Sequence, residues 1–90
     1  MTWSVRIRRS ALRELERIPP PHRGRLVRAI DRIAEAPFAG ARLKGGLNGL
    51  RRRRVGRYRV IYEIQGQHLT VLVIHVASRG SAYSRLVGGR

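Results

Sequence analysis

Residues 50–65 read LRRRRVGRYRVIYEIQ and contain two strand-like runs, Leu50–Val55 and Tyr58–Gln65, on either side of the dipeptide Gly56-Arg57. Glycine readily adopts the positive φ angle of a tight hairpin turn, so the two runs are expected to pair antiparallel. A third run, His68–Ser78, follows after another glycine turn. Strands joined in sequence by short turns predict an antiparallel meander.

The residues before this meander predict one strand and two helices. In Trp3–Arg8, apolar and polar residues alternate with the period of a half-buried strand. A helix with Ser10 as its N-cap is expected to end at the three prolines 19–21, because proline lacks a backbone donor. A second helix is expected to follow and to end at Pro37. Residues 36–49 contain four glycines and are predicted to form a loop.

The predicted fold is α+β with the order β-α-α-β-β-β, a helical hairpin packed on an antiparallel sheet. A chain of 90 residues is expected to form a single domain, 1–90, with a frayed tail at 86–90. Alternation places two apolar rows under the helices: Tyr58, Val60, Tyr62 and Ile64, and in the next strand Leu72, Ile74 and Val76. Arg59, Ile61 and Glu63 point the other way, so the second face of the sheet carries arginines.

The charge of the chain is strongly one-sided. The sequence has 20 Lys and Arg residues, of which only Lys44 is a lysine, against five acidic residues, and the net charge is +15. Such a surface predicts a nucleic-acid or acidic protein partner. Eight basic residues and no acid lie between positions 42 and 59: Arg42, Lys44, Arg51, Arg52, Arg53, Arg54, Arg57 and Arg59. They predict a phosphate-binding surface on the sheet, and a solvated basic strand is the alternative.

Several classes of protein are excluded. The sequence has no cysteine, which excludes disulfide scaffolds, thiolate metal sites and thiol nucleophiles. No apolar run is long enough to span a membrane and no signal peptide is recognisable, so a cytoplasmic protein without a membrane partner is expected. The three histidines lack metal-ligand spacing, so neither a metal nor a cofactor is expected. The carboxylates are expected to be solvated groups, most of them on the helices.

Three segments resemble the RelE/ParE superfamily of toxins from toxin–antitoxin pairs. They are Leu43-Lys44-Gly45, the stretch RRRVGRYRVIYEI at 52–64, and Val76-Ala77-Ser78-Arg79 with Tyr83. The resemblance extends from about Val5 to Tyr83, and the family shares the order β-α-α-β-β-β.

The resemblance implies one of two activities. RelE-like members are ribosome-dependent, metal-independent endoribonucleases that cleave mRNA in the A site, whereas ParE-like members inhibit DNA gyrase and have no nuclease activity. Arg79 followed by Tyr83, together with the basic cluster on the sheet, is similar to the RelE-like pattern. A RelE-like mRNA interferase is therefore the favoured interpretation. A ParE-like toxin, a non-enzymatic nucleic-acid-binding module and an inactive toxin remnant are the alternatives.

By this resemblance, a ribose 2′-OH attacks the adjacent phosphorus and leaves a 2′,3′-cyclic phosphate. Arg59 and Arg79 are assigned to the charge that develops on the phosphorane oxygens. Arg52 and Arg54 are assigned to the flanking phosphates, where relatives commonly carry lysine. Further contacts with RNA phosphates are expected from Lys44, Arg51, Arg53 and Arg57.

The general base must be sought outside the arginine cluster, because arginine stays protonated and cannot replace a titrating lysine. Tyr83 is the candidate base, and its alternative roles are to stack on a nucleobase or to close the core. Lys44 is a candidate acid. The other two tyrosines match the apolar face and are expected to be structural.

The resemblance also implies partners. The expected ones are a cognate acidic antitoxin, the ribosome and mRNA, with promoter DNA bound only through the antitoxin complex. Attraction between an acidic antitoxin and a chain of charge +15 is expected to give fast, salt-sensitive association.

Overall fold

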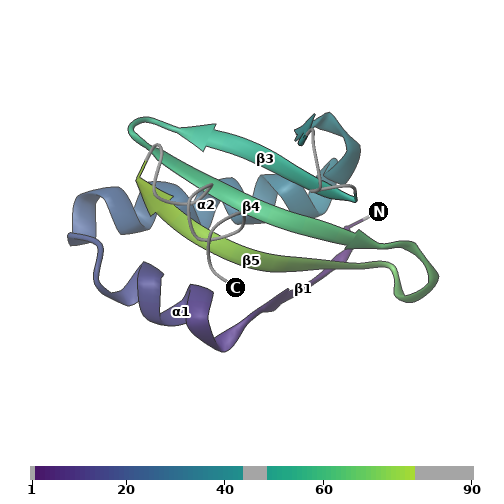
Figure 1. Ribbon diagram of the computed structural model, residues 1–90, viewed down its shortest axis with the longest axis horizontal. Coiled ribbons are helices and arrows are strands. Elements are labelled where there is room, and N and C mark those ends of the chain that lie inside the picture. The colour runs from purple at the N-terminus through teal and green to yellow at the C-terminus, as the bar shows by residue number, and fades with distance from the viewer. Residues whose placement is uncertain (1, 44–48, 79–90) are drawn as a thin grey trace.

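The computed structural model describes residues 2–43 and 49–78 of the chain (Figure 1). The elements are, in chain order, β1 (Ser4–Ile7), α1 (Arg9–Glu16), α2 (Pro20–Glu35), the 3₁₀ helix η1 (Pro37–Ala39), β2 (Ala41–Arg42), β3 (Leu50–Val55), β4 (Tyr58–Gln65), the 3₁₀ helix η2 (Gly66–His68) and β5 (Thr70–Ser78). The strands form one sheet in the spatial order β1-β5-β4-β3-β2. The predicted α+β fold is confirmed, with β2 as an additional short strand.

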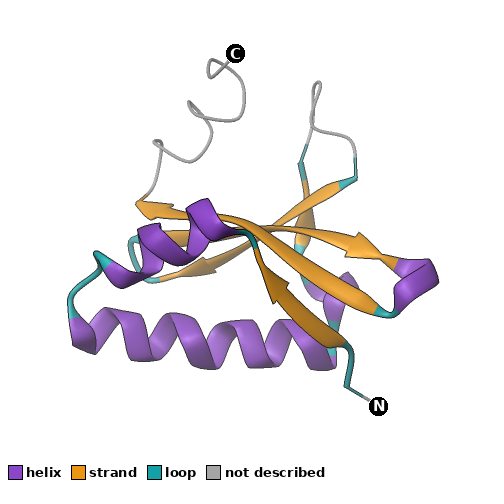
Figure 2. Ribbon diagram, turned by 90° about the horizontal axis from the view of Figure 1, so that it is seen from below, coloured by secondary structure: helices purple, strands orange, loops and turns teal. Residues whose placement is uncertain are grey.

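The two helices take different positions against the sheet. α2 runs behind it in Figure 1, and α1 lies beside β5, next to the end of β1 (Figures 1 and 2). Prolines occupy the first turn of α2, where the missing N–H would have no intrahelical partner. Leu26, Ile30 and Ile33 of α2 are buried in the main core. Among the described residues, no helix is long and apolar enough to cross a membrane.

The start of α1 differs from the prediction. The helix begins at Arg9 with Arg8 as its N-cap, and Ser10 lies inside the first turn instead of capping it. The Arg8 N–H donates to the Val73 carbonyl at 2.9 Å, so hydrogen bonding to β5 continues to the residue before the helix. Arg8 therefore extends the hydrogen bonding to β5 and is at the same time the N-cap of α1.

The β1 edge of the sheet is parallel. Ser4 lies opposite Thr70 and Ile7 opposite Val73, in parallel register with β5, whereas β2 to β5 are antiparallel to their neighbours. The sheet is thus mostly antiparallel, as predicted, with this one difference at an edge in the described residues.

The predicted loop at 36–49 contains two short elements, η1 and β2. Ala41 pairs with Arg52, and the ladder continues with a hydrogen bond from Leu43 N–H to the Leu50 carbonyl at 3.0 Å. Gly40 precedes β2 where the chain passes close to Tyr62; a Cβ atom at this position would overlap the Tyr62 hydroxyl. A glycine is therefore required sterically at position 40.

The alternation predicted for β4 is confirmed, but that for β5 is wrong. Val60 and Tyr62 belong to the main core with the helices. In β5, Tyr62 pairs with Val73 while Ile61 pairs with His75, so Ile74 is an extra residue in a β-bulge. A bulge shifts the alternation by one position.

As a result, Val76 lies in the main core as predicted, but on the other side of the bulge Val71 and Val73 take the place of the predicted Leu72 and Ile74. The hairpin at Gly56 forms as predicted, with φ +61° at the glycine. The second turn is wider than predicted: η2 is followed by Leu69 in the left-handed region, and β5 begins at Thr70.

Candidate functional site

The sheet face turned away from α2, which we call the open face, carries arginines from both β3 and β4. Arg52 lies opposite Ile61, and Arg54 lies opposite Arg59. Residues opposite each other in antiparallel strands point to the same face. Arg51 and Arg53 pair instead with Tyr62 and Val60 of the main core, which places them on the helix-facing side. We call Arg52, Arg54 and Arg59 the open-face arginines.

The open-face arginines bring positive charge together at two neighbouring pairs of opposed residues, Arg52 with Ile61 and Arg54 with Arg59. The Cβ atoms of directly opposed residues lie about 5 Å apart, and like charges in that arrangement are destabilising. Arg54 is exposed, whereas the Arg59 side chain is only 6% exposed. A guanidinium in such a setting favours an anionic ligand, since phosphate accepts two parallel hydrogen bonds from its planar fork.

A small apolar cluster lies beside these arginines. Leu43 and the fully buried Ile61 form its centre, with Leu50 and Ala77 packed against them. Leu43 comes directly after β2, so the cluster fixes the end of this segment against the middle of the sheet. The sequence pattern predicted that Ile61 faces this side but not that it is covered.

One of the two helix-facing arginines, Arg51, has partners within the fold. Arg51 Nη1 donates to the carbonyl oxygens of Gly40 at 2.8 Å and Phe38 at 3.3 Å, and the guanidinium lies 5.3 Å from the centre of the Phe38 ring. These contacts fasten η1 and β2 to β3. Arg51 was predicted as a phosphate contact, and the structure gives it this additional structural role. Arg57 occupies the exposed hairpin turn.

Tyr62 is a structural residue on the helix-facing side, as predicted. Its hydroxyl donates to the Pro37 carbonyl at 2.7 Å, and its side chain is fully buried. Burial raises the pKa of Tyr62 above its usual 10.0, although a backbone hydrogen bond from Gly40 and the nearby charges of Arg51 and Arg53 act to lower it. Tyr62 therefore stays protonated at neutral pH and is not a candidate base.

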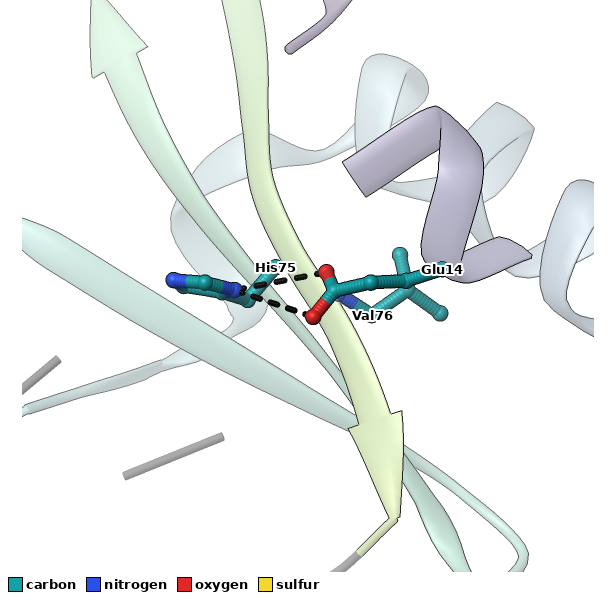
Figure 3. A network of polar contacts seen from close by, with 3 residues as sticks. All are labelled: Glu14, His75 and Val76. Carbon is teal, nitrogen blue, oxygen red and sulfur yellow. Dashed lines mark hydrogen bonds and ion pairs between the residues drawn. The ribbon is translucent and has the colours of Figure 1, made fainter. Parts of the chain in front are cut away.

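A polar network that the sequence did not predict joins α1 to β5 (Figure 3). The Glu14 carboxylate accepts a hydrogen bond from the Val76 N–H at 3.0 Å, and both of its oxygens lie 3.3 Å from His75 Nδ1. The Glu14 side chain is only 10% exposed, so the expectation of solvated carboxylates is wrong here. Because β1 ends opposite Val73, no strand of the described residues pairs with this edge of β5 beyond that point, and Glu14 supplies an acceptor there.

Three residues predicted for the site, Lys44, Arg79 and Tyr83, lie outside the described residues. Within residues 2–43 and 49–78, no group of three or more His, Cys, Asp or Glu side chains is arranged to hold a metal ion. The part of the candidate site that can be described is therefore the set of open-face arginines, with His75 opposite Ile61 on the neighbouring strand.

Comparisons with known proteins agree with the fold. A family model described as the ParE toxin of the type II toxin–antitoxin system parDE matches residues 5–83. Toxin RelG of Mycobacterium tuberculosis is 32% identical over 87 residues, which cover 94% of this chain and 100% of RelG. Toxin RelE of the same organism is 34% identical over 83 residues, which cover 90% of this chain and 86% of that toxin.

Two solved complexes have the same fold. The toxin–antitoxin complex RelBE2 from Mycobacterium tuberculosis matches with a TM-score of 0.82 and 30% identity, covering 88% of this chain and 93% of that chain. The archaeal RelE–RelB complex from Pyrococcus horikoshii matches with a TM-score of 0.72 and 26% identity, covering 89% and 98% of the two chains.

Proposed function

Since the chain belongs to the ParE toxin family of type II toxin–antitoxin systems, we propose that it is a RelE-like toxin that cleaves mRNA in the ribosomal A site. The observation that carries this proposal is the pair of opposed arginines, Arg54 and Arg59, on the sheet face turned away from the main core. The names of the relatives, RelG and RelE, support the RelE-like branch. The partner is a cognate antitoxin, because the similar structures include complexes of toxins with RelB-type antitoxins.

The proposed reaction is a transesterification. The 2′-oxygen of a ribose forms a bond to the adjacent phosphorus, the bond from phosphorus to the 5′-oxygen breaks, and a 2′,3′-cyclic phosphate remains. Negative charge builds up on the non-bridging oxygens in the transition state. Guanidinium groups that are already held in place stabilise this charge without reorganisation, and loss of one such donor is expected to cost about 10²–10³ in rate.

The arginines are given different roles in this reaction according to their positions in the chain. Arg59, held between Arg54 and Ala77 in the sheet register, donates to the phosphorane together with Arg79. Arg52 and Arg54 bind the phosphates on either side. These arginines are proposed to supply electrostatic stabilisation and to take no part in proton transfer.

Two proton transfers complete the reaction: the 2′-OH loses a proton, and the 5′-oxygen gains one. Tyr83 is the proposed base and Lys44 the proposed acid. Of the described tyrosines, Tyr62 is buried on the helix-facing side, and Tyr58 packs against the main core with its ring centre 5.5 Å from that of His22. Neither faces the open-face arginines, which supports Tyr83 as the candidate.

The test is primer extension on an mRNA in a programmed ribosome, with wild-type protein and with the variant Arg79→Ala/Tyr83→Ala. The proposal expects cuts in the A-site codon that disappear in the variant. Absence of cuts by a folded wild-type protein that still arrests growth would overturn it.

A ParE-like toxin is the second candidate, because the matching family model carries that name. A supercoiling assay with purified DNA gyrase distinguishes the two functions. Inhibition of gyrase that persists in Arg79→Ala/Tyr83→Ala, without cleavage on the ribosome, would establish the second candidate in place of the first.

A further inference from the structure

A second cluster of arginines lies on the helix side of β3, between this strand and α2. A cavity of about 300 Å³ is lined by Arg25, Arg28, Ala29, Arg32, Arg53, Arg54 and Val55. Five of these seven residues are arginines and none is acidic. We call this cavity the α2–β3 groove.

The groove exists because β2 is short. Its two residues pair only with Arg51 and Arg52, so within the described residues the part of β3 that follows pairs with β4 on one side and with no strand on the other. α2 passes along this open edge and presents Arg25, Arg28 and Arg32 to it. These three positions, spaced i, i+3 and i+7, form one row on a helix and span about 10 Å along its axis.

The groove arginines have no counterions within the described residues 2–43 and 49–78. None of the five side chains donates a hydrogen bond or forms an ion pair there, and the three on α2 are exposed. The two carboxylates of α2, Asp31 and Glu35, are exposed and do not line the groove. The positive charge of the groove is thus left for a ligand from outside to neutralise.

We propose that the α2–β3 groove binds the phosphodiester backbone of an RNA segment, as a second RNA contact separate from the open face. Its chemistry favours RNA over an acidic peptide, because only Ala29 and Val55 offer apolar surface for a peptide side chain. Guanidinium groups on both walls of the groove suit a chain of phosphates, each of which accepts paired hydrogen bonds.

The inference rests on the proposed function, which names the ribosome as the source of the RNA. Arg53 belongs to the helix-facing side and Arg54 to the open face, so the groove and the open face meet at the β3 edge but are directed to different sides of the sheet. Arg54 lines both surfaces, whereas the groove arginines of α2 lie on the helix-facing side only. Two RNA segments on two sides of the protein are available on a ribosome, where linkage of two weak contacts raises the overall affinity.

The experiment compares two triple variants of the full chain. Arg25→Gln/Arg28→Gln/Arg32→Gln removes three groove charges. Arg9→Gln/Arg13→Gln/Arg17→Gln removes three exposed charges from α1 and its C-terminal end, and serves as the matched control. Both variants lose the same net charge, and glutamine keeps the helix propensity of arginine. Circular dichroism verifies that each variant is folded.

The probe is a fluorescein-labelled RNA hairpin, and its affinity is measured by anisotropy between about 50 and 200 mM KCl. The groove variant is expected to bind about tenfold or more weakly and to lower the slope of log K against log[salt] by about 2–3, since each lost phosphate contact removes about one unit. The control is expected to change the slope by less than about one unit. Equal losses in both variants, or an unchanged slope in the groove variant, would overturn the proposal.

A second arm uses a labelled polyglutamate peptide in place of the RNA. Loss of peptide binding without loss of RNA binding in the groove variant would assign the groove to an acidic protein and overturn the RNA proposal. A third arm measures cleavage on programmed ribosomes. The groove variant is expected to need more ribosomes for half-maximal cleavage while the maximal rate stays within about threefold of wild type.

Failure of the wild-type protein to cut any mRNA would contradict the proposed function, but the RNA-hairpin comparison would still decide the groove.

Discussion

The two faces of the β3–β4 hairpin use the same residue type for different purposes. On the helix-facing side, Arg51 donates to two carbonyl oxygens and covers the Phe38 ring, so its charge is used to fix neighbouring backbone. On the open face, Arg54 stands directly opposite Arg59, so two positive charges share one side of the hairpin. Four consecutive arginines therefore divide into two sets by the alternation of the strand. Changes on the open face are expected to affect activity, and changes on the helix-facing side are expected to affect stability.

The largest expected effect is on activity. Arg59→Gln removes a donor from the proposed transition-state site and is expected to lower the cleavage rate on programmed ribosomes by about 10²–10³. Glu63→Gln, on the same strand and the same face, serves as the control and is expected to cleave at nearly the wild-type rate. Thermal melting of both variants verifies that the loss is not unfolding. Equal rates for the two variants would contradict the role given to Arg59.

The next largest expected effect is on the free energy of unfolding and concerns the helix-facing side of the sheet. Gly40→Ala introduces a Cβ atom that overlaps the Tyr62 hydroxyl and lies 3.0 Å from the Arg52 carbonyl oxygen. Because the Tyr62 side chain is fully buried, relief requires displacement of packed atoms, and a loss of about 1–3 kcal/mol in the free energy of unfolding is expected. Urea denaturation measures this loss. A variant as stable as wild type would show that η1 and β2 are not held at this position.

Glu14→Ala tests the connection between α1 and β5. The change leaves the Val76 N–H without its acceptor and is expected to cost about 2 kcal/mol in the free energy of unfolding. Glu14→Gln keeps an acceptor oxygen and is expected to cost less. Hydrogen exchange at the Val76 amide should accelerate in Glu14→Ala more than in Glu14→Gln. An unchanged exchange rate in Glu14→Ala would contradict the assigned contact.

The smallest expected effect depends on pH. Tyr62→Phe removes the hydrogen bond to the Pro37 carbonyl and is expected to cost about 1 kcal/mol at neutral pH. Because burial raises the pKa of Tyr62 in the folded protein, the unfolded chain loses this proton first as the pH rises above about 10. The stability advantage of wild type should be constant below pH 10 and decrease above it. Denaturation of both proteins from pH 7 to 11 measures it, and a difference that stays constant above pH 10 would contradict the prediction.

Sequence reasoning succeeded where the signal is local. The period of two in β4 placed Arg59 and Ile61 opposite the core, the glycine at position 56 located the hairpin, and the prolines marked the start of α2. It failed for the bulge at Ile74, because an extra residue in a run of β-branched and apolar side chains leaves no mark in the composition.

Long-range contacts were also missed. Glu14 and Val76 are 62 positions apart, and no pattern in the sequence connects a helix carboxylate to a strand amide. The same applies to the parallel pairing of β1 with β5. For the candidate site, alternation placed Arg59 away from the core, and the family resemblance grouped it with Arg52 and Arg54. The use of Arg51 by the carbonyls of Phe38 and Gly40 depends on a β2 strand that was not predicted.

The most direct test of the different roles of the two faces replaces alternate arginines of β3 by glutamine. Primer extension on programmed ribosomes, at saturating ribosome concentration, compares wild type, Arg52→Gln/Arg54→Gln and Arg51→Gln/Arg53→Gln, which lose the same charge from opposite sides of one strand. The account predicts A-site cuts by wild type, their loss in Arg52→Gln/Arg54→Gln, and their retention in Arg51→Gln/Arg53→Gln with a lowered melting temperature. Equal cleavage by both double variants, or no cuts by wild type, would contradict it.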